Sequence, residues 1–267
     1  MYVTCSRCGI TNYLFSDSSA RHTQAIATNA SFLPALADKT LILSNNGDWD
    51  QALDTAQRLL DAEAEHLDAL AAIAVHAFTQ EAQPHDAVQK LEDLDAALKS
   101  KEPQSIETHV SLAALFSQLC SRQPRTLQIC LRMLERALKA CKKPQQEARV
   151  LCQMGHLYLL QGGGGLDKAL RAFRDATKRD AANVKVLLGM VLCQLAEGAV
   201  DDAEAQIELL TLMHSAEDLG FELLYLQAQI QKSKKGGKKD HYAALQACHE
   251  SFLAWQQSSA ADSIAEE

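Results

Sequence analysis

Apolar side chains recur along the second half of this chain at the spacing of one face of an α-helix. In the segment that starts at Leu151 they lie at offsets 0, 3, 7 and 8. In the segment after the four glycines, which starts at Leu166, they lie at offsets 0, 3, 4, 7 and 10. These positions are Leu151, Met154, Tyr158 and Leu159, then Leu166, Ala169, Leu170, Phe173 and Ala176. Apolar residues three and four apart share a helix face. The pattern predicts a helical hairpin with its turn at residues 162–165.

The hairpin pattern recurs, and alanines mark its period. Ala52 and Ala87 are 35 residues apart, and Ala169 and Ala203 are 34 apart, each early in a second helix. This spacing resembles the tetratricopeptide repeat, a helix–turn–helix unit of about 34 residues with small side chains where its helices touch. For the same reason we expect Gly155 to face Ala169.

The repeats predict an all-α fold. We expect six helical hairpins, at about 31–64, 67–100, 104–142, 145–181, 183–214 and 217–257. One hairpin cannot bury its apolar stripe alone, so we expect tetratricopeptide-like hairpins stacked in one right-handed superhelical solenoid. Residues 1–30 have no sustained stripe and predict a poorly ordered leader, and the polar residues 258–267 predict a disordered tail.

Composition and charge narrow the possible functions. Only 5% of residues are aromatic, and Ala and Leu dominate, which disfavours a sheet-based enzyme. The net charge of −8 argues against a nucleic-acid partner. No run approaches the ~18 apolar residues that membrane insertion requires. Most of the eight cysteines fall inside helical patterns, as packing residues in a reducing, cytoplasmic compartment would.

Cys5 and Cys8 are the only metal-binding pattern in the sequence. They form a CxxC, half of a four-ligand zinc site, and only His22 lies near them along the chain. An enzyme with a zinc-bearing N-terminus is one alternative, and it rests on these two cysteines alone. No HExxH motif occurs, and glycines 162–165 lack the Lys-Ser/Thr of a phosphate loop. We therefore expect no catalytic residue, cofactor or small-molecule substrate.

Four polar residues are the candidates for a protein-binding surface. Arg149, Gln153 and His156 lie on the first helix of the fourth hairpin, and Lys185 lies on the first helix of the fifth. First helices line the inner, concave surface of such solenoids, which is where extended partners bind. We expect binding energy to be spread over this surface.

Several stretches resemble one family more closely than the general repeat does. They include residues 31–35, 48–51, 55–60, 91–94, 102–104, 134–137, 193–198 and 224–226. These stretches are similar to the tetratricopeptide repeat protein 21 family, and the resemblance covers about residues 31–232. The chain resembles only an N-terminal-half segment of the much longer family members, so we expect a fragment or a truncated gene model.

The resemblance implies a function. The family is a non-enzymatic subunit of intraflagellar transport complex A, which carries cargo back from the ciliary tip. It implies the other complex A subunits as partners, and a location in the cilium or flagellum, at the ciliary base and in the cytoplasm. The alternative is a peptide-binding adaptor of the co-chaperone kind. Such adaptors resemble one another in a Lys and Asn clamp, where this chain has Ala37 and Leu41.

Overall fold

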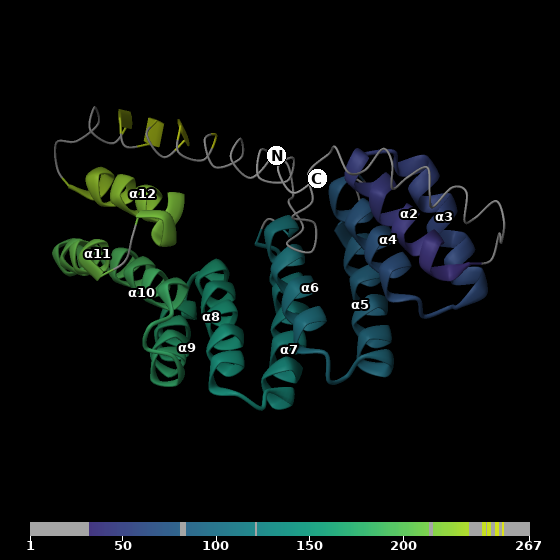
Figure 1. The fold of residues 1–267 in the computed structure, drawn as a ribbon, viewed down its shortest axis with the longest axis horizontal. Helices are drawn as coiled ribbons and strands as arrows, with labels where there is room; N and C mark the ends of the chain where they lie inside the picture. The colour runs from purple at the N-terminus through teal and green to yellow at the C-terminus, as the bar shows by residue number, and fades with distance from the viewer. Residues whose placement is uncertain are drawn as a thin grey trace. The chain divides into compact units, whose positions relative to one another are not determined.

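The computed structural model describes residues 32–80, 84–120, 122–213 and 216–234, together with seven positions between 242 and 253. The described residues form helices and no strand, in the order shown in Figure 1. None of the described helices is both long and apolar enough to cross a bilayer. The expected leader at 1–30, with Cys5 and Cys8, lies outside the described residues, as does the expected tail at 258–267.

The chain divides into two compact units, Met1–Ala140 and Cys141–Glu267. The N-terminal unit contains α2 (Leu33–Asn46), α3 (Trp49–Ala62), α4 (Leu67–Thr79), α5 (Pro84–Lys101), α6 (Ile106–Leu119) and α7 (Pro124–Ala140). The C-terminal unit contains α8 (Pro144–Gln161), α9 (Gly165–Arg179), α10 (Val184–Glu197), α11 (Val200–Met213) and α12 (Ala216–Ser233). Most of the second half of the sixth expected hairpin lies outside the described residues.

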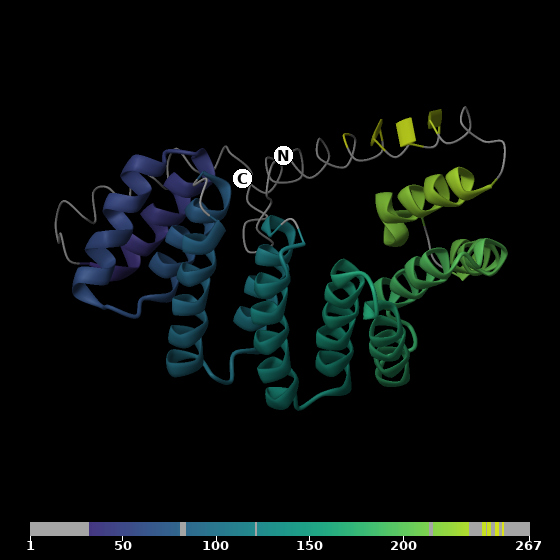
Figure 2. The same cartoon turned by 180° about the vertical axis from the view of Figure 1, so that it is seen from behind.

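Consecutive helices pair as hairpins within each unit. In the N-terminal unit α2 packs on α3, α4 on α5 and α6 on α7, and α4 also contacts α2 and α6. In the C-terminal unit α8 packs on α9, and α10 contacts α8, α9, α11 and α12. Figures 1 and 2 show these pairs from opposite sides. The predicted all-α repeat fold is confirmed.

The marker alanines of the sequence pattern are all buried. Ala52, Ala169 and Ala203 have no exposed surface, and Ala87 is 2% exposed. They lie in α3, α9, α11 and α5, the second helices of four hairpins. The 34–35-residue period therefore reflects a recurring contact where only a small side chain fits.

Glycines end the first helices of two hairpins in the same way. Gly47, after α2, has φ +79°, and Gly198, after α10, has φ +82°. Their amides donate to carbonyl oxygens of the preceding turn. L-residues avoid this left-handed conformation, so a glycine is favoured where each chain reverses into the second helix.

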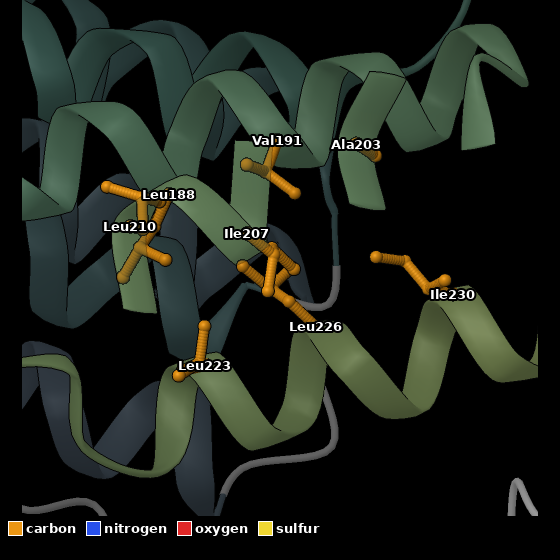
Figure 3. Packing of buried hydrophobic residues seen from close by; sticks show 8 residues of the cluster. All are labelled: Leu188, Val191, Ala203, Ile207, Leu210, Leu223, Leu226 and Ile230. Atoms are coloured by element: carbon orange, nitrogen blue, oxygen red, sulfur yellow. The ribbon is translucent and has the colours of Figure 1, made fainter. Parts of the chain in front are cut away.

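The end of the C-terminal unit is held by an apolar cluster drawn from three helices. Figure 3 shows its members, Leu188 and Val191 of α10, Ala203, Ile207 and Leu210 of α11, and Leu223, Leu226 and Ile230 of α12. Each is at most 7% exposed. Burying a Leu or Ile side chain stabilises a fold by roughly 1.5–3 kcal/mol, so this cluster fixes α12 on α10 and α11.

The fourth hairpin contains one contact that the sequence did not predict. The three heavy atoms nearest to a Cβ built on Gly155 all belong to the ring of Phe173, with Cζ at 2.6 Å. Gly155 thus makes room for Phe173 of α9, and the expected contact of Gly155 with Ala169 stays a prediction. Ala169 is buried in the same cluster as Phe173, one helical turn away. The sequence identified the small residue but not the large one opposite it.

Candidate protein-interaction surfaces

The four residues expected to form a binding surface lie on two first helices that pack together. Arg149, Gln153 and His156 are on α8, four and three residues apart and so on one face of it. Lys185 lies in the first turn of α10, which contacts α8. Arg149 and Lys185 are exposed, and Gln153 and His156 are half-buried. The structure therefore gathers the four residues within one unit.

His156 links this surface to the core below it. Its ring meets Phe173 edge-on with centroids 5.2 Å apart, and its Nε2 is 3.7 Å from Cys152 Sγ. Burial lowers the pKa of His156, and the nearby positive charge of Lys185 lowers it further. A histidine with a lowered pKa is neutral at pH 7. His156 is therefore a neutral imidazole near the exposed cation of Lys185.

A buried ionic cluster in the N-terminal unit has no counterpart in the sequence prediction. Asp95 of α5 is 8% exposed, and its Oδ1 accepts a hydrogen bond from Arg136 Nη2 of α7. Arg132 Nη2, one turn earlier on α7, is 3.5 Å from Asp95 Oδ2. Two guanidinium groups therefore compensate one buried carboxylate and join α5 to α7.

The same cluster fixes the protonation of a buried histidine. His109 of α6 is fully buried, its Nε2 is 3.3 Å from Arg136 Nε, and its Nδ1 is 2.7 Å from the Ser105 carbonyl oxygen. Because a guanidinium only donates, Nε2 must accept and Nδ1–H must donate. Burial lowers the pKa of His109, and the charge of Arg136 adds to this effect. His109 is a neutral structural bridge between α6 and α7.

Sequence reasoning missed this cluster because its members are far apart along the chain. Asp95 and Arg136 are separated by 41 residues, and His109 and Arg136 by 27. The only sign of the cluster in the sequence is that Asp95 and His109 stand at helix positions where an apolar, buried residue would be expected. The cluster contains ionisable groups, but every described contact satisfies another group of the fold, which favours a structural role.

A second exposed surface lies between α11 and α12. A hollow of about 390 Å³ is lined by Ile207, Glu208, Thr211, Leu212 and Gln227. Leu212 is 86% exposed, Leu209 on the same helix is 55% exposed, and Tyr225 of α12 is 46% exposed. Leu209 and Leu212, three residues apart on α11, are therefore exposed apolar side chains of the kind found at protein contacts.

The cysteines inside the helices behave as packing residues. Burial raises the pKa of Cys193 to about 12 and that of Cys130 further still. A thiol protonated at neutral pH is neither a nucleophile nor a metal ligand. Within the described residues no three His, Cys, Asp or Glu side chains are grouped as metal ligands would be. The Cys5–Cys8 half-site lies outside those residues.

Comparison with known proteins decides the family. The profile of the tetratricopeptide repeat protein 21 second ARM domain matches residues 89–260. The chain belongs to the tetratricopeptide repeat protein 21 family. It is 34% identical to the human tetratricopeptide repeat protein 21B over 211 residues, which cover 79% of this chain and 16% of that protein. The mouse 21B protein is 33% identical over 217 residues, 81% of this chain and 16% of that protein.

The chain spans about one sixth of the length of these family members. Mouse tetratricopeptide repeat protein 21A is also similar, at 27% identity over 236 residues, 88% of this chain and 18% of that protein. The resemblance to the family that the sequence stretches indicated is confirmed.

Solved structures of low sequence identity share the fold. A tetratricopeptide repeat protein from Parabacteroides merdae matches with a TM-score of 0.64 at 14% identity, covering 89% of this chain and 86% of that one. PilW, a type IV pilus biogenesis factor, matches with a TM-score of 0.54 at 15% identity, covering 77% of this chain and 89% of that one. At such identities the likeness concerns the repeat architecture alone.

Proposed function

We propose that this chain is a non-enzymatic interaction scaffold, a segment of an intraflagellar transport complex A subunit that acts in retrograde ciliary transport and cilium assembly. Its membership of the tetratricopeptide repeat protein 21 family carries the proposal. The partners are other complex A subunits, without nucleic acid, membrane insertion or a small-molecule substrate. The place of action is the cilium or flagellum and its base, reached from the cytoplasm.

The proposed contact with a partner is the α8–α10 surface of Arg149, Gln153, His156 and Lys185. Exposed Arg149 and Lys185 would attract acidic segments, and half-buried Gln153 and neutral His156 would exchange hydrogen bonds with a partner backbone. Arginine is among the residues enriched at interface hot spots. Because a solenoid contacts partners over many positions, each residue should contribute a fraction of the affinity.

The alternative, a peptide-binding adaptor of the co-chaperone kind, has less support. Its clamp for a terminal carboxylate uses Lys and Asn on consecutive first helices, as the resemblance among such adaptors implies. At the matching positions Ala37 is half-buried and Leu41 is 42% exposed. Neither side chain can hold a carboxylate by charge or hydrogen bond. The zinc-enzyme alternative still rests on Cys5 and Cys8 alone.

Binding to purified complex A subunits tests the scaffold proposal. The full chain should retain at least one subunit, and the double variant Arg149→Glu/Lys185→Glu should retain several-fold less. Arg174→Glu is the matched control, since Arg174 is an exposed arginine on α9, a second helix of the same unit. A folded, monomeric chain that retains no subunit would contradict the proposal. Equal loss with Arg174→Glu would indicate unspecific charge attraction instead.

A further inference from the structure

One face of α9 carries a row of cations, although the chain as a whole is acidic, with a net charge of −8. Lys168, Arg171, Arg174 and Lys178 are exposed and three or four residues apart. They lie on the side of the helix opposite the buried Phe173. With five basic residues against two acidic ones, α9 is locally positive. We call the four exposed cations the basic α9 stripe.

The two arginines of this stripe have no ionic partner in the described part of the chain. Lys178 differs from them, since its Nζ is 2.7 Å from Asp175 Oδ1. Arg171 and Arg174 make no ion pair or hydrogen bond with any described residue. A guanidinium presents several N–H donors in a geometry that matches a carboxylate. Two such groups, one helical turn apart, are therefore available to the carboxylates of another molecule.

A matching acidic row lies on α3. Asp50, Asp54 and Asp61 are exposed at offsets of 0, 4 and 11, on the side of the helix opposite the buried Leu59. Gln57, at offset 7, completes the row, and its Nε2 donates to Asp61 Oδ1 at 2.9 Å. Asp50 and Asp54 form no ion pair with a described residue. We call the three aspartates the acidic α3 stripe.

The two stripes match in length and are opposite in charge. Asp50 and Asp61 are 11 residues apart, and Lys168 and Lys178 are 10 apart. At the rise of an α-helix, each stripe is about 15–17 Å long.

We propose that α3 of one copy of this chain packs along α9 of a second copy, with aspartates of the acidic α3 stripe paired to Arg171 and Arg174. The two helices are labelled in Figure 1. Each copy carries one stripe of each sign, so the contact is heterologous and joins copies head to tail. This inference is independent of the proposed function, whose test uses the monomeric chain.

Screening by salt decides whether the overall repulsion between two acidic chains prevents this contact. Each exposed ion pair contributes little, so several pairs must act together and the association is weak. At physiological ionic strength the Debye length is about 8 Å. Repulsion between distant acidic groups of the two copies is then largely screened, while charges in contact still attract. Complementary charge also steers the copies into this orientation.

Sedimentation velocity of the full chain over a wide range of concentration tests the contact. At physiological salt the sedimentation coefficient should rise with concentration. It should return to the value of the monomer at about 1 M salt, where the Debye length is ~3 Å. Arg171→Glu/Arg174→Glu and Asp54→Arg/Asp61→Arg should each raise the apparent Kd about tenfold or more, because each variant places like charges opposite one another.

A mixture of the two charge-reversed variants gives the sharpest result. An equimolar mixture should associate again, because the acidic α9 of one variant then meets the basic α3 of the other. Lys99→Glu/Lys139→Glu is the matched control, since it makes the same change of charge at exposed sites on α5 and α7. The control variant should associate as the parent chain does.

Four other results would overturn the contact. A folded parent chain could stay monomeric at every concentration, and if it also sedimented with vesicles of anionic lipid, the basic α9 stripe would belong to a membrane surface. Association that persists in both double variants would belong to another surface, such as that of Leu209 and Leu212. A mixture that stays monomeric, with helices intact by circular dichroism, would exclude the pairing of the stripes. Equal loss in the control variant would indicate unspecific charge attraction.

Discussion

The tip of the Phe173 ring occupies the space where Gly189 would carry a side chain. A Cβ built on Gly189 would lie 2.5 Å from Phe173 Cζ, and one built on Gly155 would lie 2.6 Å from the same atom. Phe173 belongs to α9, Gly155 to α8 and Gly189 to α10. One fully buried ring therefore sets the closest approach of three helices in the C-terminal unit.

Gly189→Ala should destabilise the C-terminal unit by about 1–3 kcal/mol through overpacking against Phe173. The ~1 kcal/mol that alanine gains over glycine in helix propensity offsets part of this cost, so the net loss should be up to ~2 kcal/mol. Urea unfolding followed by circular dichroism measures the change. Phe173→Leu should recover some of the loss in the double variant, because the shorter side chain leaves room. An alanine variant as stable as the parent would contradict the contact.

Asp95→Asn should lower the stability of the N-terminal unit by about 2 kcal/mol, since hydrogen bonds to charged groups contribute roughly 1.5–3 kcal/mol. The change leaves Arg132 and Arg136 without their carboxylate partner. Asp93→Asn is the control, because Asp93 is exposed on the same helix and binds only Gln89 among its described contacts. Thermal unfolding of both variants provides the comparison. Equal effects would show that helix charge, rather than the cluster, matters.

Stability should fall as pH decreases from 6.5. The pKa of His109 is lowered by burial from its usual 6.5, so the unfolded chain takes up the proton first. The contribution of neutral His109 to the free energy of unfolding is fully present above pH 6.5. It is lost as the pH falls through the lower pKa of His109 in the folded chain. His156 acts in the same direction. The carboxyl of Glu63, whose pKa is lowered from 4.5, contributes only in a more acidic range.

Urea unfolding at pH 7.5 and 5.5 measures this dependence. His109→Gln should reduce it, because a glutamine amide can donate to the Ser105 carbonyl and accept from Arg136 without titrating. A pH dependence equal to that of the parent chain would exclude His109 as a source.

Alkylation should distinguish the thiols. Cys130 and Cys193, whose pKa values are raised by burial, should react with iodoacetamide only after unfolding. Cys141 is half-buried and should react first among the three. Mass spectrometry of the labelled chain at pH 8, with and without urea, gives the order. Rapid labelling of Cys130 in the folded chain would contradict the packing around it.

The spacing of residues close together in the sequence predicted most of the helices. Contacts between residues far apart along the chain could not be predicted in this way. The spacing of apolar residues identified the helices, and the alanine period identified Ala52, Ala87, Ala169 and Ala203, because a small residue at a hairpin contact is a local requirement. The partner of Gly155 could not be found this way, since Phe173 is placed by the register of three helices. Asp95 and Arg136 meet only after two hairpins have stacked.

For the candidate site, the sequence placed Arg149, Gln153, His156 and Lys185 on neighbouring first helices, and their role in binding stays a prediction. Their surroundings were not predictable. The edge-on contact of His156 with Phe173 and its lowered pKa both depend on packing between helices that are separate in the sequence.

The stepwise packing of the N-terminal unit has a mechanical consequence. The hairpin of α4 and α5 is held by α2 and α3 on one side and by α6 and α7 on the other. Lys101 pairs with Glu63 at 2.7 Å, and Arg125 pairs with Glu92, so each ionic link spans one interface between hairpins. Tension along such a stack would separate the interfaces singly, and the chain would lengthen in steps and recoil when the load is released.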